Sequence, residues 1–346
     1  MATAAELMAE EIGRSYQQTL EKAAMDTPTM VAASVVRLDF AEQLDIYGND
    51  ETPLVSTIGT TVAKAIDHKW EQATRRAAAA NANVEGSAAK AGVSRAPVKA
   101  SNTCQIVKGT VEVTRSALRE AANGIYNASL ADAISWQVEQ EMVGIFKDIE
   151  YAMLFGVEDT TDAAGSARAM KGLVGAVGTY NGFIQTTQSN GAGAAFGQTM
   201  FDNWLADIWT VQAGRYPDRI YCSLKSKQII GTFASGKFTL TINPADLGTL
   251  TAGMRVGFYE APWGGLIDIY PHPLCADSAT EANNWMLALR TDLVKRADFD
   301  PLFTRPLPGT TDAELREILW EGTLECRVEP AHGLLKNFAT DEGAGS

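Results

Sequence analysis

The chain has 346 residues, of which 46% are hydrophobic and 21% charged, a composition that is typical of a globular protein and excludes wholesale disorder. Its 29 basic and 42 acidic residues give a net charge of −13, which disfavours binding to DNA by neutralisation of phosphates. The sequence holds no apolar run of the ~20 residues needed to cross a bilayer and no signal-peptide pattern at its acidic N-terminus. We therefore expect a cytoplasmic protein without a membrane partner.

The first region, residues 1–50, is predicted to be an N-terminal arm. A helical pattern runs from Ala4 to about Ala24 and loses its periodicity near Pro28. The region therefore has the character of an arm and not of a core.

The next region, residues 51–114, is predicted to be an extended β-hairpin. Polar and apolar side chains alternate from Thr61 to Thr74 and again from Asn102 to Thr114, as they do in half-buried strands. The tip between these strands is nearly all Ala, Gly, Asn and Ser, so the hairpin cannot hold a core of its own. We expect it to lie on another chain, with Trp70, which is hard to bury in such an arm, at the contact.

The strongest helical pattern runs from Ser129 to Phe155, with Asn127 or Ser129 as the expected cap and Gly156 as the end. At 1.5 Å per residue this is a rod of about 40 Å. Its expected apolar face consists of Leu130, Ile134, Val138, Met142, Ile145, Ile149 and Met153. Three glutamates of this helix, Glu139, Glu141 and Glu150, are expected on its solvent side, as a hydrated face or a contact with basic residues of a neighbour.

The rest of the chain alternates short helices and strands after a loop-rich stretch, residues 162–197. We expect a helix at 199–213 that packs Trp209, a strand at 219–222, a helix at 226–233, a hairpin of 256–260 with 266–270, and strands at 285–289 and 318–328. In the last strand, Glu321, Thr323, Glu325 and Arg327 should form the polar face. The fold class is α+β, and the end of the chain is expected to be disordered.

Two glycine-rich motifs resemble nucleotide-binding loops only in part. Gly231 to Lys237 fits the Gly-x4-Gly-Lys frame, but Phe238 stands where a Ser or Thr must ligate magnesium, and the residues before it look helical. A loop after a short helix is therefore favoured, and a nucleotide site is the remote alternative. Gly191 to Gly197 misses the dinucleotide fingerprint by one residue and is predicted to be a flexible connector.

The spacing of cysteine and histidine argues against metal or nucleophilic chemistry. The four cysteines lie far apart, with no Cys-x-x-Cys pair, and are predicted to be buried reduced thiols: Cys104, Cys222, Cys275 and Cys326. The three histidines, His68, His272 and His332, are predicted to be hydrogen-bonded structural residues. We therefore predict no catalytic residue, no cofactor and no metal site.

Several short motifs in a fixed order carry a resemblance. They are Trp70, Glu85-Gly86, Asn102 to Ile106 and Val111 to Thr114 in the hairpin, Asp148 to Gly156 and Met170 to Leu173 around the end of the long helix, and Thr310 to Ala313, Glu321 to Glu325 and Ala331 to Gly333 near the C-terminus. In this order, from about residue 50 to 337, they resemble the podovirus-type major capsid proteins of tailed phages. Thr110 to Thr114 lacks the usual Ser-Gly-Thr, and Thr311 stands where glycine is expected, which affects the subfamily more than the fold.

The resemblance implies the shell fold shared by tailed phages, encapsulins and the herpesvirus shell floor. Its parts would be an N-terminal arm (1–50), an extended loop (51–114), a peripheral domain with a spine helix (115–175), an axial domain (176–290), a return to the peripheral domain (291–337) and a C-terminal tail (338–346). The expected contacts between subunits involve Trp70, Arg75, Arg76, Glu85, Gly86 and Gln105.

The implied function is structural and not enzymatic. The protein would self-assemble as hexamers and pentamers, in the host cytoplasm, into the icosahedral head of the virion. Scaffolding and portal proteins would be its partners, with a decoration protein as a further candidate. Packaged double-stranded DNA would face the inner surface without sequence-specific binding. The alternatives are an encapsulin-like nanocompartment around a cargo enzyme and, remotely, a nucleotide hydrolase that uses the loop at Gly231 to Lys237.

Overall fold

The computed structural model describes residues 51–76, 78–92, 94–116, 130–163, 165–211, 214–233, 258–261, 263–275, 283–308 and 312–340, with the backbone alone for 130–133. The chain divides into two compact units, Met1–Tyr47 with Ser116–Ala133, and Gly48–Arg115 with Ile134–Ser346. The first unit lies almost wholly outside the described residues, and with it the predicted N-terminal arm and the helix caps Asn127 and Ser129. Outside them also lie Thr310, Thr311 and residues 341–346 of the tail.

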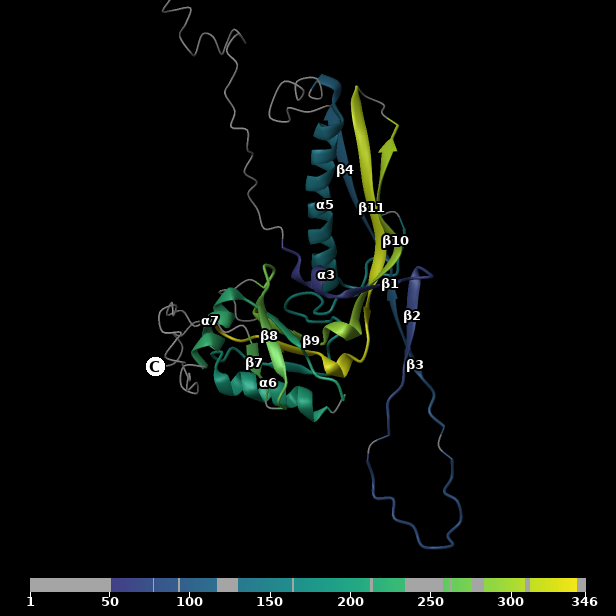
Figure 1. Ribbon diagram of the computed structural model, residues 1–346, viewed down its shortest axis with the longest axis vertical. Helices are drawn as coiled ribbons and strands as arrows, with labels where there is room; N and C mark the ends of the chain where they lie inside the picture. The colour runs from purple at the N-terminus through teal and green to yellow at the C-terminus, as the bar shows by residue number, and fades with distance from the viewer. Residues whose placement is uncertain are drawn as a thin grey trace, which may run out of the picture. The chain divides into compact units, whose positions relative to one another are not determined.

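A four-stranded sheet and a long helix form the first layer pair of the second unit. The strand order is β1 (Gly59–Val62), β10 (Val294–Leu307), β11 (Ala313–Cys326) and β4 (Gln105–Thr114). The helix α5 (Leu130–Phe155) runs alongside this sheet (Figure 1). Apolar residues of both, such as Val111, Trp320 and Ile149, share one buried cluster. The 26-residue helix confirms the predicted spine, because its apolar side chains recur every three to four residues.

A six-stranded sheet with two helices forms the second layer pair. Its strand order is β5 (Gln188–Asn190), β12 (Gly333–Lys336), β9 (Trp285–Leu289), β6 (Arg219–Cys222), β8 (Leu266–Pro271) and β7 (Phe258–Glu260). The helices α6 (Gln198–Thr210) and α7 (Leu224–Phe233) bury Phe201, Trp204 and Ile230 in a second cluster with the sheet. These elements confirm the helices and strands expected here, and the mixed α+β class.

Three short elements and a third sheet complete the fold. They are α3 (Pro53–Thr57), η4 (Thr291–Leu293) and η5 (Glu329–Ala331), and the antiparallel pair β2 (Asp67–Gln72) and β3 (Val98–Thr103). The pair β2–β3 leads into residues 73–97, called here the loop tip, which Figure 1 shows as a long excursion. We call the pair itself, together with residues 104 and 105, the loop root.

Two strand predictions are wrong in detail. The return strand expected over 102–114 divides at Cys104, because β3 pairs with β2 whereas β4 pairs with β11. In β11, Thr323 and Glu325 are buried and do not form a solvent-facing polar row. The burial of Glu325 follows from the cover of β11 by β2, whose His68 lies 3.1 Å from that carboxylate. The 14-residue strand β10 was not predicted.

Two packing predictions also differ. Trp209 is 46% exposed and stacks on Tyr216 with ring centroids 4.6 Å apart, instead of entering the core with the rest of α6. Gly191 is not part of a flexible connector, because its N–H donates to the carbonyl of Lys336 at 2.8 Å. An added Cβ at residue 191 would lie 2.8 Å from Phe338, so the close approach of these two segments requires glycine.

Candidate functional site: the root of the extended loop

The predicted contact residues fall into two groups. Arg75, Arg76, Glu85 and Gly86 lie in the loop tip, where every described residue is exposed. Gly86 has a φ of +77°, and a hydrogen bond of 3.1 Å from the N–H of Ser87 to the carbonyl of Val84 closes the turn around it. Trp70 and Gln105 belong instead to the loop root.

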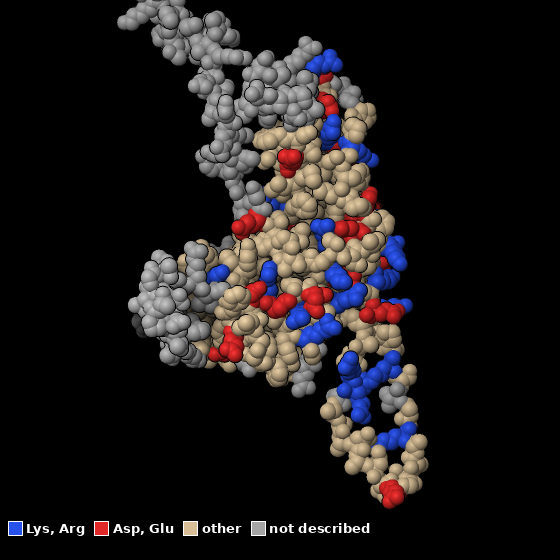
Figure 2. All heavy atoms as spheres, in the orientation of Figure 1, with Lys and Arg blue, Asp and Glu red and all other residues tan. Residues whose placement is uncertain are grey.

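The loop tip is basic on an acidic chain. Residues 73–97 hold four basic side chains (Arg75, Arg76, Lys90, Arg95) and one acidic one (Glu85), a net charge of +3, whereas the whole chain carries −13. Figure 2 shows Lys and Arg side chains gathered along the part of the loop near the root, and acidic atoms at its far end. This segment is therefore electrostatically distinct from the rest of the chain.

Trp70 is buried within its own chain, which corrects the expectation that the hairpin could not cover it. Its side chain is 5% exposed, and its ring centroid lies 6.0 Å from that of Phe183 and 5.8 Å from that of His68. The ammonium of Lys171 lies 5.0 Å from the Phe183 ring. The segment 171–184, which the sequence shows as a loop, supplies this cover because Leu173 and Ile184 fix it in the core.

A buried amide joins the root to two other parts of the chain. Asn102, fully buried, donates through Nδ2 to the carbonyls of Leu324 at 2.8 Å and Lys171 at 3.1 Å. Its Oδ1 accepts from the N–H of Lys171 at 2.8 Å and of Thr103 at 3.0 Å. The amide uses both donors and its acceptor, so β3, β11 and residue 171 are fastened at one point.

Gln105, three residues after Asn102, also fastens the root to the segment around residue 170. Its Oε1 accepts a hydrogen bond from the N–H of Met170 at 3.3 Å. Gln105 therefore contacts its own chain, and its predicted contact with a neighbour is untested.

A buried carboxylate holds the other strand of the root. Glu325, 1% exposed, lies 3.1 Å from Nε2 of His68 and forms an ion pair with Arg327. The amide of Gln72 accepts from the N–H of Val328 at 3.0 Å. β2 therefore covers the face of β11 that was expected to meet solvent, and the buried charge of Glu325 has partners on both sides.

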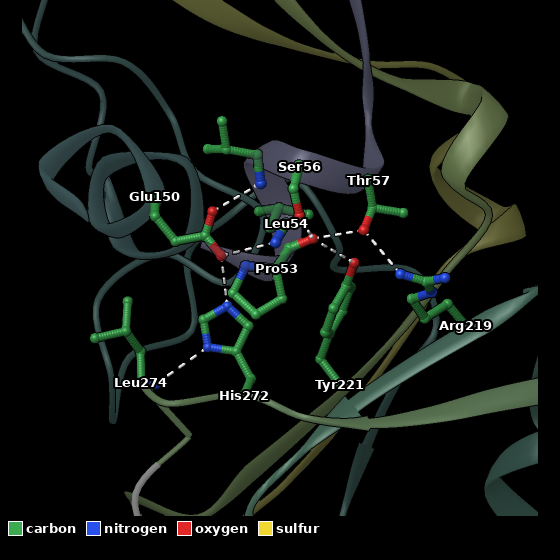
Figure 3. Close-up of polar contacts among 10 residues, drawn as sticks. Pro53, Leu54, Ser56, Thr57, Glu150, Arg219, Tyr221, His272 and Leu274 are labelled. Atoms are coloured by element: carbon green, nitrogen blue, oxygen red, sulfur yellow. Dashed lines mark hydrogen bonds and ion pairs between the residues drawn. The ribbon is translucent and has the colours of Figure 1, made fainter. Parts of the chain in front are cut away.

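A second buried carboxylate fixes the segment that leads into the loop (Figure 3). Glu150 on α5, 2% exposed, accepts from the N–H of Leu54 at 2.8 Å and of Val55 at 2.7 Å. Its Oε1 also lies 2.7 Å from Nε2 of His272. Thr52 gives α3 no side-chain cap, so Glu150 satisfies the N–H groups of its first turn.

The expectation that Glu150 faces solvent is wrong. The helix α3 and His272 cover this turn of α5, whereas Glu139, about three turns earlier on nearly the same side of the helix, is exposed. A sequence signal for this existed, because Glu150 stands four residues after Phe146 and three before Met153, and both of these are apolar. Glu150 therefore shares a helix face with core residues.

The same short helix is also tied to the six-stranded sheet. Arg219 on β6 donates to Oγ1 of Thr57 at 2.8 Å, and the hydroxyl of Tyr221 donates to the carbonyl of Pro53 at 3.4 Å (Figure 3). Burial raises the pKa of Tyr221, which keeps its hydroxyl a donor. Residues 53–57 thus contact α5 on one side and β6 on the other.

The histidines and cysteines of the chain are all described, and their partners can be named. His68 and His272 lie within hydrogen-bond distance of a carboxylate and His332 bonds to the backbone, so the predicted hydrogen bonding of the three histidines is confirmed. All four cysteines are buried reduced thiols, as predicted, and burial raises the pKa of Cys104 to about 11. Within the described part of the chain no group of three His, Cys, Asp or Glu side chains could hold a metal ion.

The motif that resembles a phosphate-binding loop begins inside a helix. Gly231 to Phe233 form the end of α7, and residues 234–238 lie outside the described residues. A phosphate-binding loop follows a buried strand and precedes a helix, so the described half of this motif does not match that arrangement.

None of the described helices combines the length and apolar character needed to cross a membrane.

Comparison with known proteins identifies a family and a fold. The family model described as SU10 major capsid protein matches residues 17–339. The structure is similar to the capsid of a native GTA particle, at 12% identity and a TM-score of 0.60 over 90% of this chain and 98% of that one. It is similar to the capsid of cyanophage A-1(L), at 14% identity and a TM-score of 0.58 over 89% and 98%.

An encapsulin shares the same fold. The holo-SrpI encapsulin of Synechococcus elongatus has a TM-score of 0.55 at 13% identity over 90% of this chain and 96% of that one. No curated protein matches the chain. The expected shell fold is confirmed by these likenesses, whereas its division into peripheral and axial domains stays a prediction.

Proposed function

The chain belongs to the SU10 major capsid protein family, and as a major capsid protein it forms the head shell of a tailed phage; from this premise we propose that its extended loop is the clamp between neighbouring subunits. In this proposal the loop tip presents Arg75, Arg76, Glu85 and Gly86 to the neighbour. Trp70 and Gln105 act from within the subunit, by holding the root in place.

The observation that carries the proposal is the contrast between a fastened root and an uncovered tip. Asn102 is fully buried, whereas every described residue of the loop tip is exposed. Ordering the backbone of a segment costs about 1–2 kcal/mol per residue, and small side chains recover little of this by burial. A second subunit can supply the missing contacts, through its side chains and through hydrogen bonds to the backbone.

The charge of the tip specifies the chemistry of that contact. A net charge of +3 on residues 73–97, within a chain of −13, favours an acidic surface on the next subunit. Such a contact between solvent-exposed charges weakens as salt is added. The acidic chain as a whole would also leave packaged double-stranded DNA without sequence-specific contacts.

The remaining features of the assembly follow from the same proposal. Subunits would associate as hexamers and pentamers in the host cytoplasm, with scaffolding and portal proteins as partners and a decoration protein as a further candidate. The likeness to an encapsulin concerns the fold, and the family match favours a head that encloses DNA over a compartment for a cargo enzyme.

Shortening the tip tests the clamp. Replacing Ala78–Gly92 by a short Gly-Ser turn should leave the melting temperature of the unassembled subunit within about 3 °C of the wild type, because these residues bury little. The same change should abolish closed shells in electron micrographs. Normal shells from the shortened chain would show that the loop is not a clamp.

Two pairs of charge variants then test the chemistry of the contact. Neutralising Arg75 and Arg76 to Gln should slow assembly by about tenfold at low salt and much less at high salt. The matched control changes Lys69 and Lys99 to Gln, because these lysines pair with Asp67 at 2.8 Å and Glu71 at 3.9 Å within the same chain. Equal effects of both pairs on light-scattering kinetics would contradict the proposal.

A further inference from the structure

The segment between the two large sheets contains a strained residue. Residues 327–332, called here the crossover, lead from the end of β11 to the start of β12. Val328 in the crossover has φ 51° and ψ 62°, the left-handed conformation. A β-branched side chain disfavours this conformation strongly, so surrounding contacts must hold residue 328 in place.

On one side the crossover is held by the loop root. The Oε1 atom of Gln72 on β2 accepts a hydrogen bond from the N–H of Val328 at 3.0 Å. The preceding residue, Arg327, forms an ion pair with Glu325. Glu325 in turn lies 3.1 Å from Nε2 of His68, which is on β2 like Gln72. β2 therefore contacts the crossover in two ways. Gln72 accepts directly from Val328, and His68 reaches Arg327 through the buried carboxylate of Glu325.

On the other side the crossover is fastened to the six-stranded sheet. The carboxylate of Glu329 accepts from the N–H groups of Gln185 and Thr186, both at 2.7 Å. His332, fully buried, accepts at Nδ1 from the N–H of Arg290 at 3.1 Å and donates from Nε2 to the carbonyl of Arg327 at 3.2 Å. Its own carbonyl accepts from the hydroxyl of Thr187, next to the edge strand β5.

We propose that Val328 is a conformational switch that couples the loop root to the six-stranded sheet. Gln72 keeps residue 328 in the left-handed conformation. When β2 is displaced, residue 328 relaxes, and the change passes through Glu329 and His332 to the edge formed by β12 and β5. A backbone held in a sparsely populated φ/ψ region has a discrete alternative in the well-populated regions, which is what a switch requires. The coupling acts within one subunit and does not depend on whether the loop tip contacts a neighbour.

Amide hydrogen exchange on the full-length protein tests the coupling. In Gln72→Ala the acceptor for Val328 is lost, and peptides covering residues 185–190 and 329–336 should exchange about tenfold faster than in the wild type. Gln72→Glu keeps an acceptor oxygen and should exchange within about twofold of the wild type. The matched control is Gln105→Ala, which removes an amide acceptor from the same root but faces Met170, and it should leave these peptides within about twofold.

A double variant separates coupling from general loosening. Glycine adopts the left-handed conformation without strain, so in Val328→Gly the crossover no longer needs Gln72. Exchange in Gln72→Ala with Val328→Gly should therefore match that of Val328→Gly alone, within about twofold. Exchange in the double variant as fast as in Gln72→Ala alone would overturn the proposal. It would also be overturned if Gln72→Ala had no effect on exchange, or if Gln105→Ala had an equal effect. If Gln72→Ala does not fold, recovery of folding by Val328→Gly supports the proposal and continued failure overturns it.

Discussion

The root and the tip of the extended loop are neighbours in sequence but opposite in physical character. The root places Asn102 and Trp70 in the core and gives the amide of Asn102 four hydrogen bonds. In the tip, by contrast, Asn81 is exposed, and its side-chain oxygen accepts from the ammonium of Lys90 at 2.5 Å. The same residue type thus stabilises the subunit in one place and is left accessible in the other. Within one loop, buried residues of the root hold the segment in place, and exposed residues of the tip remain available for contact.

The two asparagines give the largest expected difference. Asn102→Ala leaves up to four backbone groups without their partner, two from buried and two from part-buried hydrogen bonds, and should lower the free energy of unfolding by about 4 kcal/mol. Asn81→Ala removes a solvated contact and should change it by less than about 0.5 kcal/mol. Urea denaturation of the unassembled subunit measures both. Similar losses in the two variants would remove the distinction between root and tip.

Acid should weaken the crossover that adjoins the root. Burial lowers the pKa of His332 to about 4, from an ordinary value of 6.5. Neutral His332 therefore stabilises the fold fully above pH 6.5, and this contribution is lost as the pH falls from 6.5 to 4, to an extent on the order of 3 kcal/mol.

The measurement is the free energy of unfolding of the wild type minus that of His332→Gln across this pH range. The difference should shrink as the pH falls, because Gln at position 332 does not titrate. A difference that stays constant with pH would show that His332 is not held neutral. The other titratable groups of the chain are the same in both proteins, so their contributions cancel in this difference.

Two glutamates on one helix provide a smaller contrast of the same kind. Glu150→Gln places an amide N–H₂ against a backbone N–H of α3 and should cost about 2 kcal/mol of unfolding free energy. Glu139→Gln, about three turns earlier on α5 where the side chain is exposed, should cost less than about 0.5 kcal/mol. Thermal unfolding compares them directly. Equal costs would mean that the capping of α3 by Glu150 contributes nothing.

The smallest expected effect belongs to the tip itself. Arg76→Ala should leave the free energy of unfolding unchanged within about 0.5 kcal/mol, because the exposed side chain has solvent around it. Any effect of this variant should appear in assembly and not in subunit stability. A loss above about 1 kcal/mol in chemical denaturation would place Arg76 in the root rather than the tip.

The sequence predicted the elements better than the contacts between them. Periodicity located α5 and the hairpin of β7 with β8, because both patterns depend on residues close in sequence. The bonds of the root join residues far apart, such as His68 with Glu325 across 257 positions and Glu150 with Leu54 across 96. Because these side chains are polar, the sequence indicated that they lie at the surface. They are buried because segments from distant parts of the chain cover them.

Trp70 is a second case in which the sequence did not reveal a contact between residues far apart in the chain. The sequence correctly indicated that β2 and β3 alone lack a core. It did not reveal that Phe183, 113 positions further along the chain, lies against the indole ring. A loop-rich composition around residues 171–184 indicated little burial, yet Leu173 and Ile184 are fully buried.

The buried thiols have a practical consequence for labelling chemistry. All four cysteines of the sequence are described and buried, and burial raises the pKa of Cys104 to about 11, which suppresses the reactive thiolate. A cysteine introduced at the exposed Ser87 would thus react with a maleimide dye without removal of the native ones. A fluorophore pair on neighbouring subunits could then report the position of the loop while a shell forms.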